Sequence, residues 1–430
     1  MTVEKATQPV TEEQAFLGAI QQDPDDDGRR LVFADWLDEH GDPGRAEFIR
    51  VQCALARTPK YDSRRPALEQ REQSLPIRPQ TEWAKPLSAI TREYEFRRGF
   101  VEWVAIGARK FLTHGTKLFA LAPIRYVKLL RLGSSNVASL DLADNPLLAR
   151  LRGLDLQGRL NADDLRTLLT SPHLTRLGAL AFPNCDFEVA GLEPLLNGCL
   201  GRLETLDLGL QERRDSESHR FGTAQVESLA EARWCRTLRQ LSFKNHRINV
   251  GGAVALAAAR QLKELRRLTL HNCGIGLAGT TALANSPHLN KLATLDLRRN
   301  KLGDRAVQAL ATARGLPALE ELYLGMNELG LPAVEALIGW PGLAKLRLLH
   351  LYCNPIGDEG VIALASCPAS AGLWHLDLLG TEMGERGARA LAESPYLGQL
   401  RCLEVGCPPG AGAKALRARF GPVWRNQNGI

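Results

Sequence analysis

Apolar and polar positions follow a fixed order along residues 238–400, and this order repeats every 27 residues. Each repeat opens with the pattern L-x-x-L-x-[LFV], and the opening residues are Leu238, Leu265, Leu292, Leu319, Leu346, Leu373 and Leu400. The last two apolar positions of the pattern are two residues apart, so both point to one face of a short strand. One unit cannot bury its leucines alone, so a fixed period of this size indicates stacked units that share one core.

The second half of each unit predicts a turn and then a helix. Asn300, Asn327 and Asn354 stand at the ninth position, where a side-chain amide can hydrogen-bond backbone groups of the turn. In one of these units, Gly303 and Asp304 indicate the start of the helix, with Asp304 as its N-cap. Each unit is therefore expected to be a strand, a turn and a helix.

The same spacing extends toward the N-terminus. Further units open at residues 101, 127, 151, 177 and 203, which gives twelve units in all. The interval from Leu203 to Leu238 is 35 residues, and its surplus is the polar segment 211–220. Two interpretations of this segment remain open: a solvent loop that the fold tolerates, or a loop that binds a partner.

These repeats resemble the leucine-rich repeat family, specifically its ribonuclease-inhibitor-like class. The resemblance implies an α/β solenoid with a curved parallel sheet inside and helices outside, and proteins of this family bind other proteins and rarely catalyse reactions. Cys185 and Cys273 are accepted variants at position nine. Other units depart from the family pattern at this position, and we expect irregular turns at Arg159, Gln211, His246 and Pro408.

The N-terminal part predicts a small all-helical module. Residues 1–10 form a polar tail, and helices are expected at 12–22, 28–40 and 43–57. Within this module, Ala34-Asp-Trp-Leu37 and the run R-A-E-F-I-R-x-Q at 45–52 resemble the bacterial repeat-companion domain. That resemblance implies a bacterial source and no mechanism. We therefore divide the chain into a tail (1–10), a helical module (11–57), a connector and N-terminal cap (58–95) and a solenoid (96–430).

Composition narrows the function further. The formal net charge is +6, and residues 1–57 carry six basic and twelve acidic side chains, so the helical module is acidic. Charges of both signs are interspersed elsewhere, which disfavours nucleic acid as a partner. No apolar run is long enough to span a membrane. Nine cysteines, an odd number without framework spacing, favour reduced thiols in the cytoplasm. We expect a cytoplasmic monomer without a cofactor.

Three patterns suggest a metal or catalytic site, and each is incomplete. Residues 23–28 match the first half of a calcium loop, but Ala34 stands where a bidentate Glu should close it. His350 and Asp377 should be cross-strand neighbours, yet Cys353 lies roughly 10 Å from His350, too far to serve as their nucleophile. Cys402 and Cys407 lack C-x-x-C spacing and a histidine pair. We therefore predict no catalytic residue and no metal site.

Binding residues are expected where stacking leaves side chains available, at positions three, five, seven and eight of each unit. Arginine and aromatic side chains there are typical of protein-binding hot spots. The predicted partner-binding residues are Lys244, His271, Asp296, Arg298, Arg299, Tyr323, Met326, His350, Tyr352 and Asp377. The sequence thus favours a noncatalytic scaffold that holds a protein partner. The alternatives are an activator of a GTPase-like nucleotide hydrolase and a nucleic-acid-binding protein.

Overall fold

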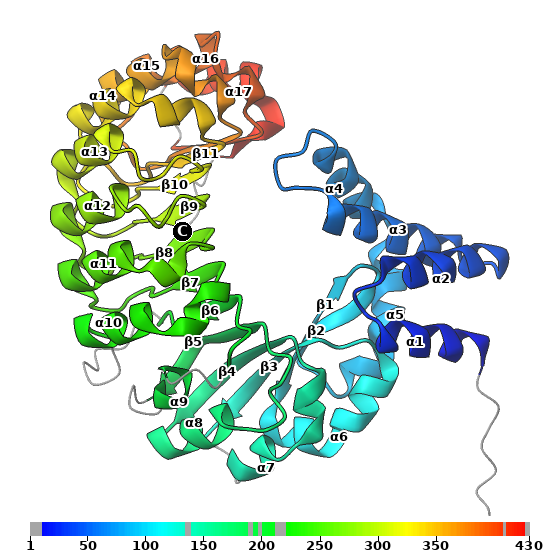
Figure 1. The fold of residues 1–430 in the computed structure, drawn as a ribbon. Helices are drawn as coiled ribbons and strands as arrows, with labels where there is room; N and C mark the ends of the chain where they lie inside the picture. The colour runs from blue at the N-terminus through cyan, green and yellow to red at the C-terminus, as the bar shows by residue number, and fades with distance from the viewer. Residues whose placement is uncertain are drawn as a thin grey trace, which may run out of the picture. The chain divides into compact units, whose positions relative to one another are not determined.

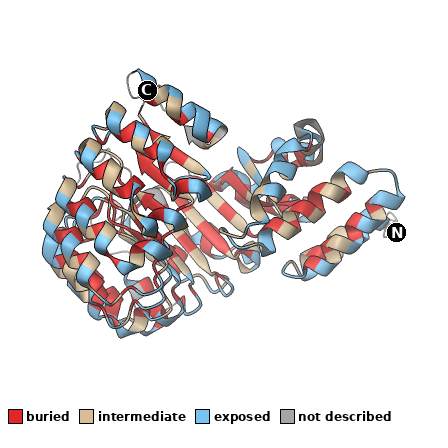
Figure 2. Cartoon of the chain, turned by 90° about the horizontal axis from the view of Figure 1, so that it is seen from above, coloured by how far each residue is buried: buried red, intermediate tan, exposed pale blue. Residues whose placement is uncertain are grey.

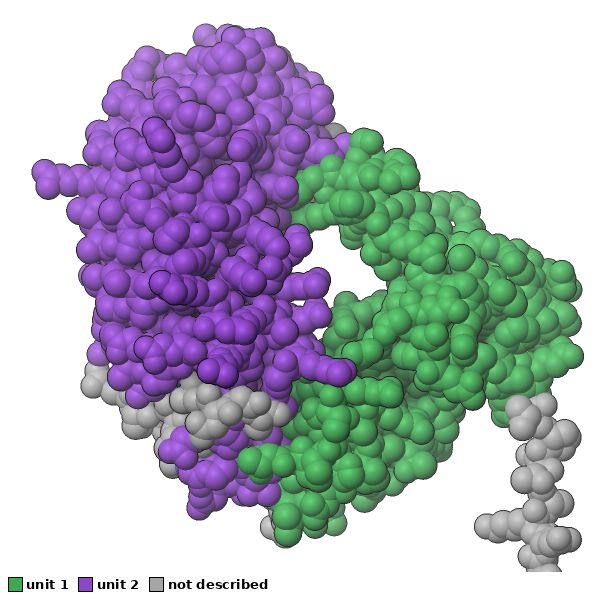
Figure 3. Space-filling view, in the orientation of Figure 1, with its two compact units in different colours: residues 1–160, 170–177 green, residues 161–169, 178–430 purple. Residues whose placement is uncertain are grey.

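The structure is a computed structural model that describes residues 11–133, 139–187, 192–196, 200–210, 221–406 and 410–425. The predicted tail 1–10 and the loop 211–220 lie outside these residues. The chain divides into two compact units, residues 1–160 with 170–177 (unit 1) and residues 161–169 with 178–430 (unit 2), which Figure 3 distinguishes by colour. Within the described part of the chain, no helix is both long and apolar enough to cross a membrane.

Unit 1 begins with five helices, of which the first three confirm the predicted helices to within a residue. Their bounds are α1 Glu12–Gln22, α2 Asp27–Glu39, α3 Pro43–Arg57, α4 Arg65–Ser74 and α5 Ile77–Ser88. Side-chain caps explain where they start: Thr11 and Gln14 form a capping box on α1, and Asp42 accepts the Arg45 N–H on α3. Phe33 on α2 and Ile49 on α3 are buried in the core of the module.

Arginines neutralise the acidic residues at the start of α2. Asp27 accepts a 2.8 Å bond from Arg57, and Asp25 lies 2.8 Å from Arg125 and 3.2 Å from Arg152. Partial burial raises the pKa of Asp25, but the charges of Arg125 and Arg152 and the hydrogen bond from Arg125 outweigh this effect and leave the pKa below its ordinary value. Within the acidic segment 23–28, Asp25 and Asp27 are thus held by ion pairs at the start of α2.

A buried ion pair joins the helical module to the strands of unit 1. Arg30 of α2 is fully buried and donates to Glu102 over 2.6 Å, and Glu102 is only 1% exposed. Arg98 also contacts Glu102, at 3.2 Å. Removing the Glu102 carboxylate would leave the buried Arg30 guanidinium without its closest partner, and such a loss typically costs about 3–5 kcal/mol.

The strands of unit 1 are β1 Glu93–Arg97, β2 Phe100–Gly107, β3 Tyr126–Leu132 and β4 Gly153–Leu160, in that order in the sheet. β1 is antiparallel to β2, and the other pairs are parallel. Helices α6 Ala108–Leu121 and α7 Ser139–Ala143 follow β2 and β3.

The register of β3 corrects one predicted unit. Val127 is paired with Val104 on one side and with Leu154 on the other, and both of these are fourth-position residues. The unit therefore opens at Ile124, three residues before the predicted opening at Val127. The run from Ile124 to Leu132 offers two sets of apolar residues with the same spacing, so spacing alone could not choose between them.

Unit 2 repeats a strand, a turn and a helix. Its strands, parallel and in chain order, are β5 Ala179–Phe187, β6 Thr205–Asp207, β7 Gln240–Ser242, β8 Arg267–Thr269, β9 Thr294–Asp296, β10 Glu321–Tyr323, β11 Leu348–His350, β12 His375–Leu378, β13 Cys402–Val405 and β14 Trp424–Arg425. Its helices are α8 Ala162–Leu169, α9 Glu193–Leu196, α10 Thr223–Glu231, α11 Asn249–Ala258, α12 Gly276–Ala284, α13 Gly303–Thr312, α14 Leu331–Gly339, α15 Gly357–Ala365, α16 Glu385–Glu393 and α17 Ala411–Phe420.

The core of unit 2 lies between its strands and its helices. Fourth-position leucines such as Leu295, Leu322 and Leu349 are at most 1% exposed, and Figure 2 shows buried residues along the strands and on the adjoining helix faces. In Figure 1 the strands β6–β11 line the inner side of this unit and the helices α10–α16 its outer side. The predicted α/β solenoid with an N-terminal helical module is therefore confirmed.

Buried, hydrogen-bonded side chains at position nine follow one another along unit 2 in a series that we call the turn ladder: His246, Cys273, Asn300, Asn327 and Asn354. Asn327 donates to the carbonyl oxygens of Leu297 and Leu324 and accepts the N–H of Asn300 over 2.7 Å. The predicted role of these amides in the turn is confirmed. Each amide also donates a hydrogen bond to a leucine carbonyl oxygen of the preceding repeat, so the ladder joins one repeat to the next.

His246 joins this ladder although its identity suggested an irregular turn. Its Nδ1 accepts the Phe221 N–H over 2.9 Å, and its Nε2 lies 2.6 Å from the carbonyl oxygen of Leu208. The expectation for His246 is therefore wrong, because the imidazole makes both bonds to the preceding repeat. Gln211 and Pro408 lie outside the described residues.

The predicted N-cap of α13 is also wrong. Asp304 lies inside the helix, and its Oδ1 accepts the Gly330 N–H at the start of α14 over 2.8 Å. Asp358 of α15 accepts the Gly384 N–H before α16 in the same way, over 2.7 Å. These carboxylates therefore cap the helix of the next repeat. In both cases the capped N–H lies 26 residues further along the chain.

Candidate functional site

One face of unit 2, which we call the strand side, carries positions three, five, seven and eight of each repeat. From β7 to β13 the strands are paired in constant register, for example Leu322 with Leu349. Equal positions in neighbouring repeats therefore lie about 4.8 Å apart. Side chains at these positions form ladders across the sheet.

Asp296 and Arg298 form a doubly bonded ion pair at the end of β9. Arg298 Nε lies 2.9 Å from Asp296 Oδ1, and Arg298 Nη2 lies 2.6 Å from Oδ2. Burial lowers the pKa of Arg298, but the hydrogen bonds and charge of Asp296 outweigh this effect and leave the pKa above its ordinary value. The Arg298 guanidinium also lies 5.2 Å from the ring centre of Tyr323, a cation–π contact with β10.

Glu321 is a buried carboxylate that holds Tyr323. Its Oε2 accepts the Tyr323 hydroxyl and the Thr294 hydroxyl, each over 3.3 Å, and lies 3.5 Å from Arg267. Burial raises the pKa of Tyr323 to about 12, and the charge of Glu321 adds to the shift. The predicted binding residues do not include Glu321, although position three is one of the positions expected to be available for binding. The sequence feature that could have identified Glu321 is its place at position three of its repeat.

His350 connects the next strands. Its Nε2 lies 2.9 Å from Asp377 Oδ2, which confirms that these residues are cross-strand neighbours. Its ring centre lies 5.6 Å from that of Tyr323 and 5.7 Å from that of Tyr352. Gly325 makes this packing possible, because a Cβ there would approach the imidazole to 2.8 Å.

Six of the ten predicted residues thus meet in one continuous set, which we call the aromatic stripe: Asp296, Arg298, Tyr323, His350, Tyr352 and Asp377. Arg299 and Met326 form a separate pair at position eight, with 2.9 Å between Nε and Sδ. Lys244 and His271 stand at position seven in the two repeats before Arg298. His271 is only 7% exposed, and burial lowers its pKa to about 4. Its imidazole is thus as enclosed as the carboxylates of Asp296 and Asp377, which are 5% and 4% exposed.

Comparison with known families matches two segments of unit 2, residues 288–311 and 342–365, to the family model described as Leucine Rich repeat. The chain contains leucine-rich repeats. These segments cover the turns of Asn300 and Asn354, where the repeat is most regular. A search of the curated proteins found no match.

Solved structures with a similar course of the chain share few identical residues with it. The internalin InlF of Listeria monocytogenes is 15% identical, with 80% of this chain and 88% of that chain covered and a TM-score of 0.43. A chain of the yeast Rad7 and Elc1 complex is 16% identical, with 98% and 96% covered and a TM-score of 0.48. InlP of Listeria monocytogenes is 14% identical, with 60% and 57% covered and a TM-score of 0.29.

Proposed function

We propose that this leucine-rich repeat protein is a noncatalytic scaffold that holds a protein partner on the strand side of unit 2, centred on the aromatic stripe. The observation that carries this proposal is the unbroken series of contacts from Asp296 through Arg298, Tyr323 and His350 to Asp377. A guanidinium, an imidazole and two phenol rings are thereby presented side by side on three consecutive repeats. Arginine and tyrosine are among the residues enriched in protein-binding hot spots.

Preorganisation is the physical basis of this function. Binding normally costs about 0.5–1.5 kcal/mol for each side chain that must be ordered at the interface. In the stripe, buried Asp296 and Asp377 already hold Arg298 and His350 in place. A partner would therefore meet side chains whose conformations are set before it arrives.

The finer assignments belong to the same proposal. Helices of nine or ten residues in α11–α16, one in each repeat, support the ribonuclease-inhibitor-like class. Helices α1–α3 support residues 11–57 as a separate helical module of the companion type, followed by the connector 58–95 and the solenoid 96–430. We further propose a cytoplasmic, monomeric bacterial protein.

The experiment is quantitative affinity capture from lysate, followed by a binding titration with each captured protein. The test variant is Arg299→Ala with Tyr352→Ala, which changes one residue of the position-eight pair beside the stripe and one residue of the stripe itself. Arg298 is left intact, because replacing it would leave the buried carboxylate of Asp296 without its partner. The matched control makes the same chemical changes away from the strand side, at Arg305 of α13 and at Tyr396, which follows α16.

A partner on the stripe should bind the test variant at least about 30-fold more weakly, equivalent to about 2 kcal/mol, and bind the control as it binds wild type. A partner that binds both variants equally would contradict the assignment of the stripe. It would direct attention to the segment 211–220 or to the helical module. Thermal melting of both variants checks that they remain folded.

A further inference from the structure

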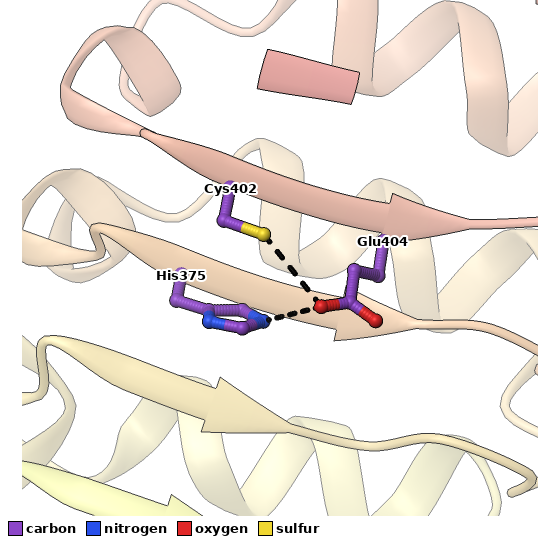
Figure 4. Close-up of side chains that lie close together, drawn as sticks. All are labelled: His375, Cys402 and Glu404. Atoms are coloured by element: carbon purple, nitrogen blue, oxygen red, sulfur yellow. Dashed lines mark hydrogen bonds and ion pairs between the residues drawn. The ribbon is translucent and has the colours of Figure 1, made fainter. Parts of the chain in front are cut away.

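Three side chains of types that can coordinate a metal meet on two neighbouring strands, outside the aromatic stripe. His375 on β12 is directly opposite Cys402 on β13, and Glu404 stands two residues beyond Cys402 on the same face. Glu404 Oε1 lies 3.2 Å from His375 Nε2 and 3.6 Å from Cys402 Sγ. One ligand atom from each residue lies within 4.8 Å of the others, and Figure 4 shows the three side chains turned toward one point.

The separations fit the edges of a tetrahedron around zinc. With Zn–N and Zn–O bonds of about 2.0 Å and a Zn–S bond of about 2.3 Å, tetrahedral geometry separates N from O by about 3.3 Å and S from O by about 3.5 Å. The corresponding distances from Glu404 are 3.2 Å and 3.6 Å. The ligand atoms of His375 and Cys402 lie within 4.8 Å of each other, and zinc binding would bring them to about 3.5 Å.

The ligand types also indicate which metal would bind. A thiolate with an imidazole is a soft to borderline donor pair that favours Zn²⁺ over Mg²⁺ or Ca²⁺, which prefer sets of oxygen ligands. The side chains of His375 and Glu404 are 29% and 17% exposed, so an ion can reach them from solvent. Neighbouring Asp377 adds a buried carboxylate that strengthens the attraction for a cation.

We propose that His375, Cys402 and Glu404 form a Zn²⁺ site on the strand side of unit 2. Three protein ligands leave the fourth tetrahedral position to water, as in open zinc sites. The spacing of Cys402 and Cys407 along the chain did not predict this site, because no histidine pair accompanies them. The missing ligand, His375, stands 27 residues before Cys402 and meets it only because the repeats stack in register.

The test is a titration of the full chain with Co²⁺ after removal of metal by a chelator. Cobalt bound to a thiolate gives a charge-transfer absorption band, and Zn²⁺ should displace it because zinc binds more tightly to the same ligands. We expect one ion per chain and no response to Mg²⁺. Cys402→Ser and His375→Ala should each weaken the affinity by at least about 100-fold, since even the loss of an outer-shell partner typically costs 10–100-fold.

Cys367→Ser is the matched control, because Cys367 is another half-buried thiol of unit 2, bonded instead to the carbonyl oxygen of Ile338. This variant should keep the cobalt band. A second measurement needs no variant: Zn²⁺ should slow alkylation of Cys402 in wild type and leave Cys367 unaffected. Absence of the band in wild type, its retention in Cys402→Ser, or equal alkylation of Cys402 with and without Zn²⁺ would overturn the proposal.

Discussion

Two ladders of polar side chains run through unit 2 with the same 27-residue period. They differ in the groups with which their side chains interact. In the turn ladder, buried amides pair with backbone groups: Asn327 bonds the N–H of Asn300 and the carbonyl oxygens of Leu297 and Leu324. In the aromatic stripe, side chains pair with one another, as Arg298 does with Asp296. The first ladder satisfies groups that would otherwise be buried without a hydrogen bond, whereas the second leaves part of its surface exposed to solvent.

The difference separates stability from binding within one repeat. Loss of a turn-ladder side chain exposes no binding surface but leaves several backbone groups unsatisfied, and each such group costs about 1–3 kcal/mol. Loss of a ring at the edge of the stripe removes contact area for a partner and little else. Substitutions in the two ladders should therefore affect different measurements.

The largest effect is expected from Asn327→Ala. This change removes one acceptor and one donor group that serve four backbone partners, including the carbonyl oxygen of Gly325. The free energy of unfolding should fall by about 3–5 kcal/mol in urea denaturation. Asn290→Ala, at an exposed asparagine, should change it by less than about 0.5 kcal/mol. A loss below about 1 kcal/mol for Asn327→Ala would contradict the structural role of the ladder.

His246→Ala tests whether the imidazole is a full member of the turn ladder. It should lower the free energy of unfolding by about 2–4 kcal/mol, because the N–H of Phe221 and the carbonyl oxygen of Leu208 lose their partner. Urea denaturation measures this loss, as it does for Asn327→Ala. His288→Ala, a half-buried histidine of the same unit, serves as control and should have a small effect. Equal losses for the two histidines would show that the ladder is interrupted at His246.

The smallest expected effect is the change in folding stability with pH that His271 causes. This strand-side residue is buried, as are the residues of the turn ladder. Burial lowers its pKa from 6.5 to about 4; Asp296 acts in the opposite direction, while Arg298, Lys244 and Arg299 add to the lowering. The unfolded chain therefore binds this proton more readily, so stability is complete above pH 6.5 and declines as the pH falls toward 4.

After allowance for solvent screening, we expect His271 to account for a loss on the order of 1–2 kcal/mol over this range. His271→Gln should remove that part of the pH dependence. The measurement is the urea midpoint of both proteins at pH 7 and pH 4.5. Parallel pH profiles would show that the imidazole is accessible to protons in the folded chain.

Strongly periodic segments could be predicted from the sequence, and segments with competing periods could not. The 27-residue spacing located the strands β7 to β13, and turn signals located α1 to α3. The unit at β3 was misplaced by three residues, because Val127 and Ile124 both begin an acceptable apolar pattern. Cross-strand pairing resolves this choice, since only one register brings Val127 opposite Val104 and Leu154.

The aromatic stripe could be predicted residue by residue, since equal positions in a repeat must lie side by side. The burial of each strand-side residue could not be predicted. His271 occupies position seven of its repeat, as Arg298 does, yet it is enclosed, because burial depends on the surrounding side chains. The group around Cys402 was missed for a related reason, because His375 stands on the neighbouring strand.

The sequence by itself determined the repeat length, the strand–turn–helix order and the face that each side chain occupies, because these follow from local periodicity and turn chemistry. Tertiary structure decided which repeat contains the interaction partner of each polar side chain. Asp304 caps the helix of the next repeat, His246 bonds the preceding one, and His375 meets Cys402 across two strands. Such partners are close in space only after stacking, and the free energy of burying the leucines, not any local preference, brings them together.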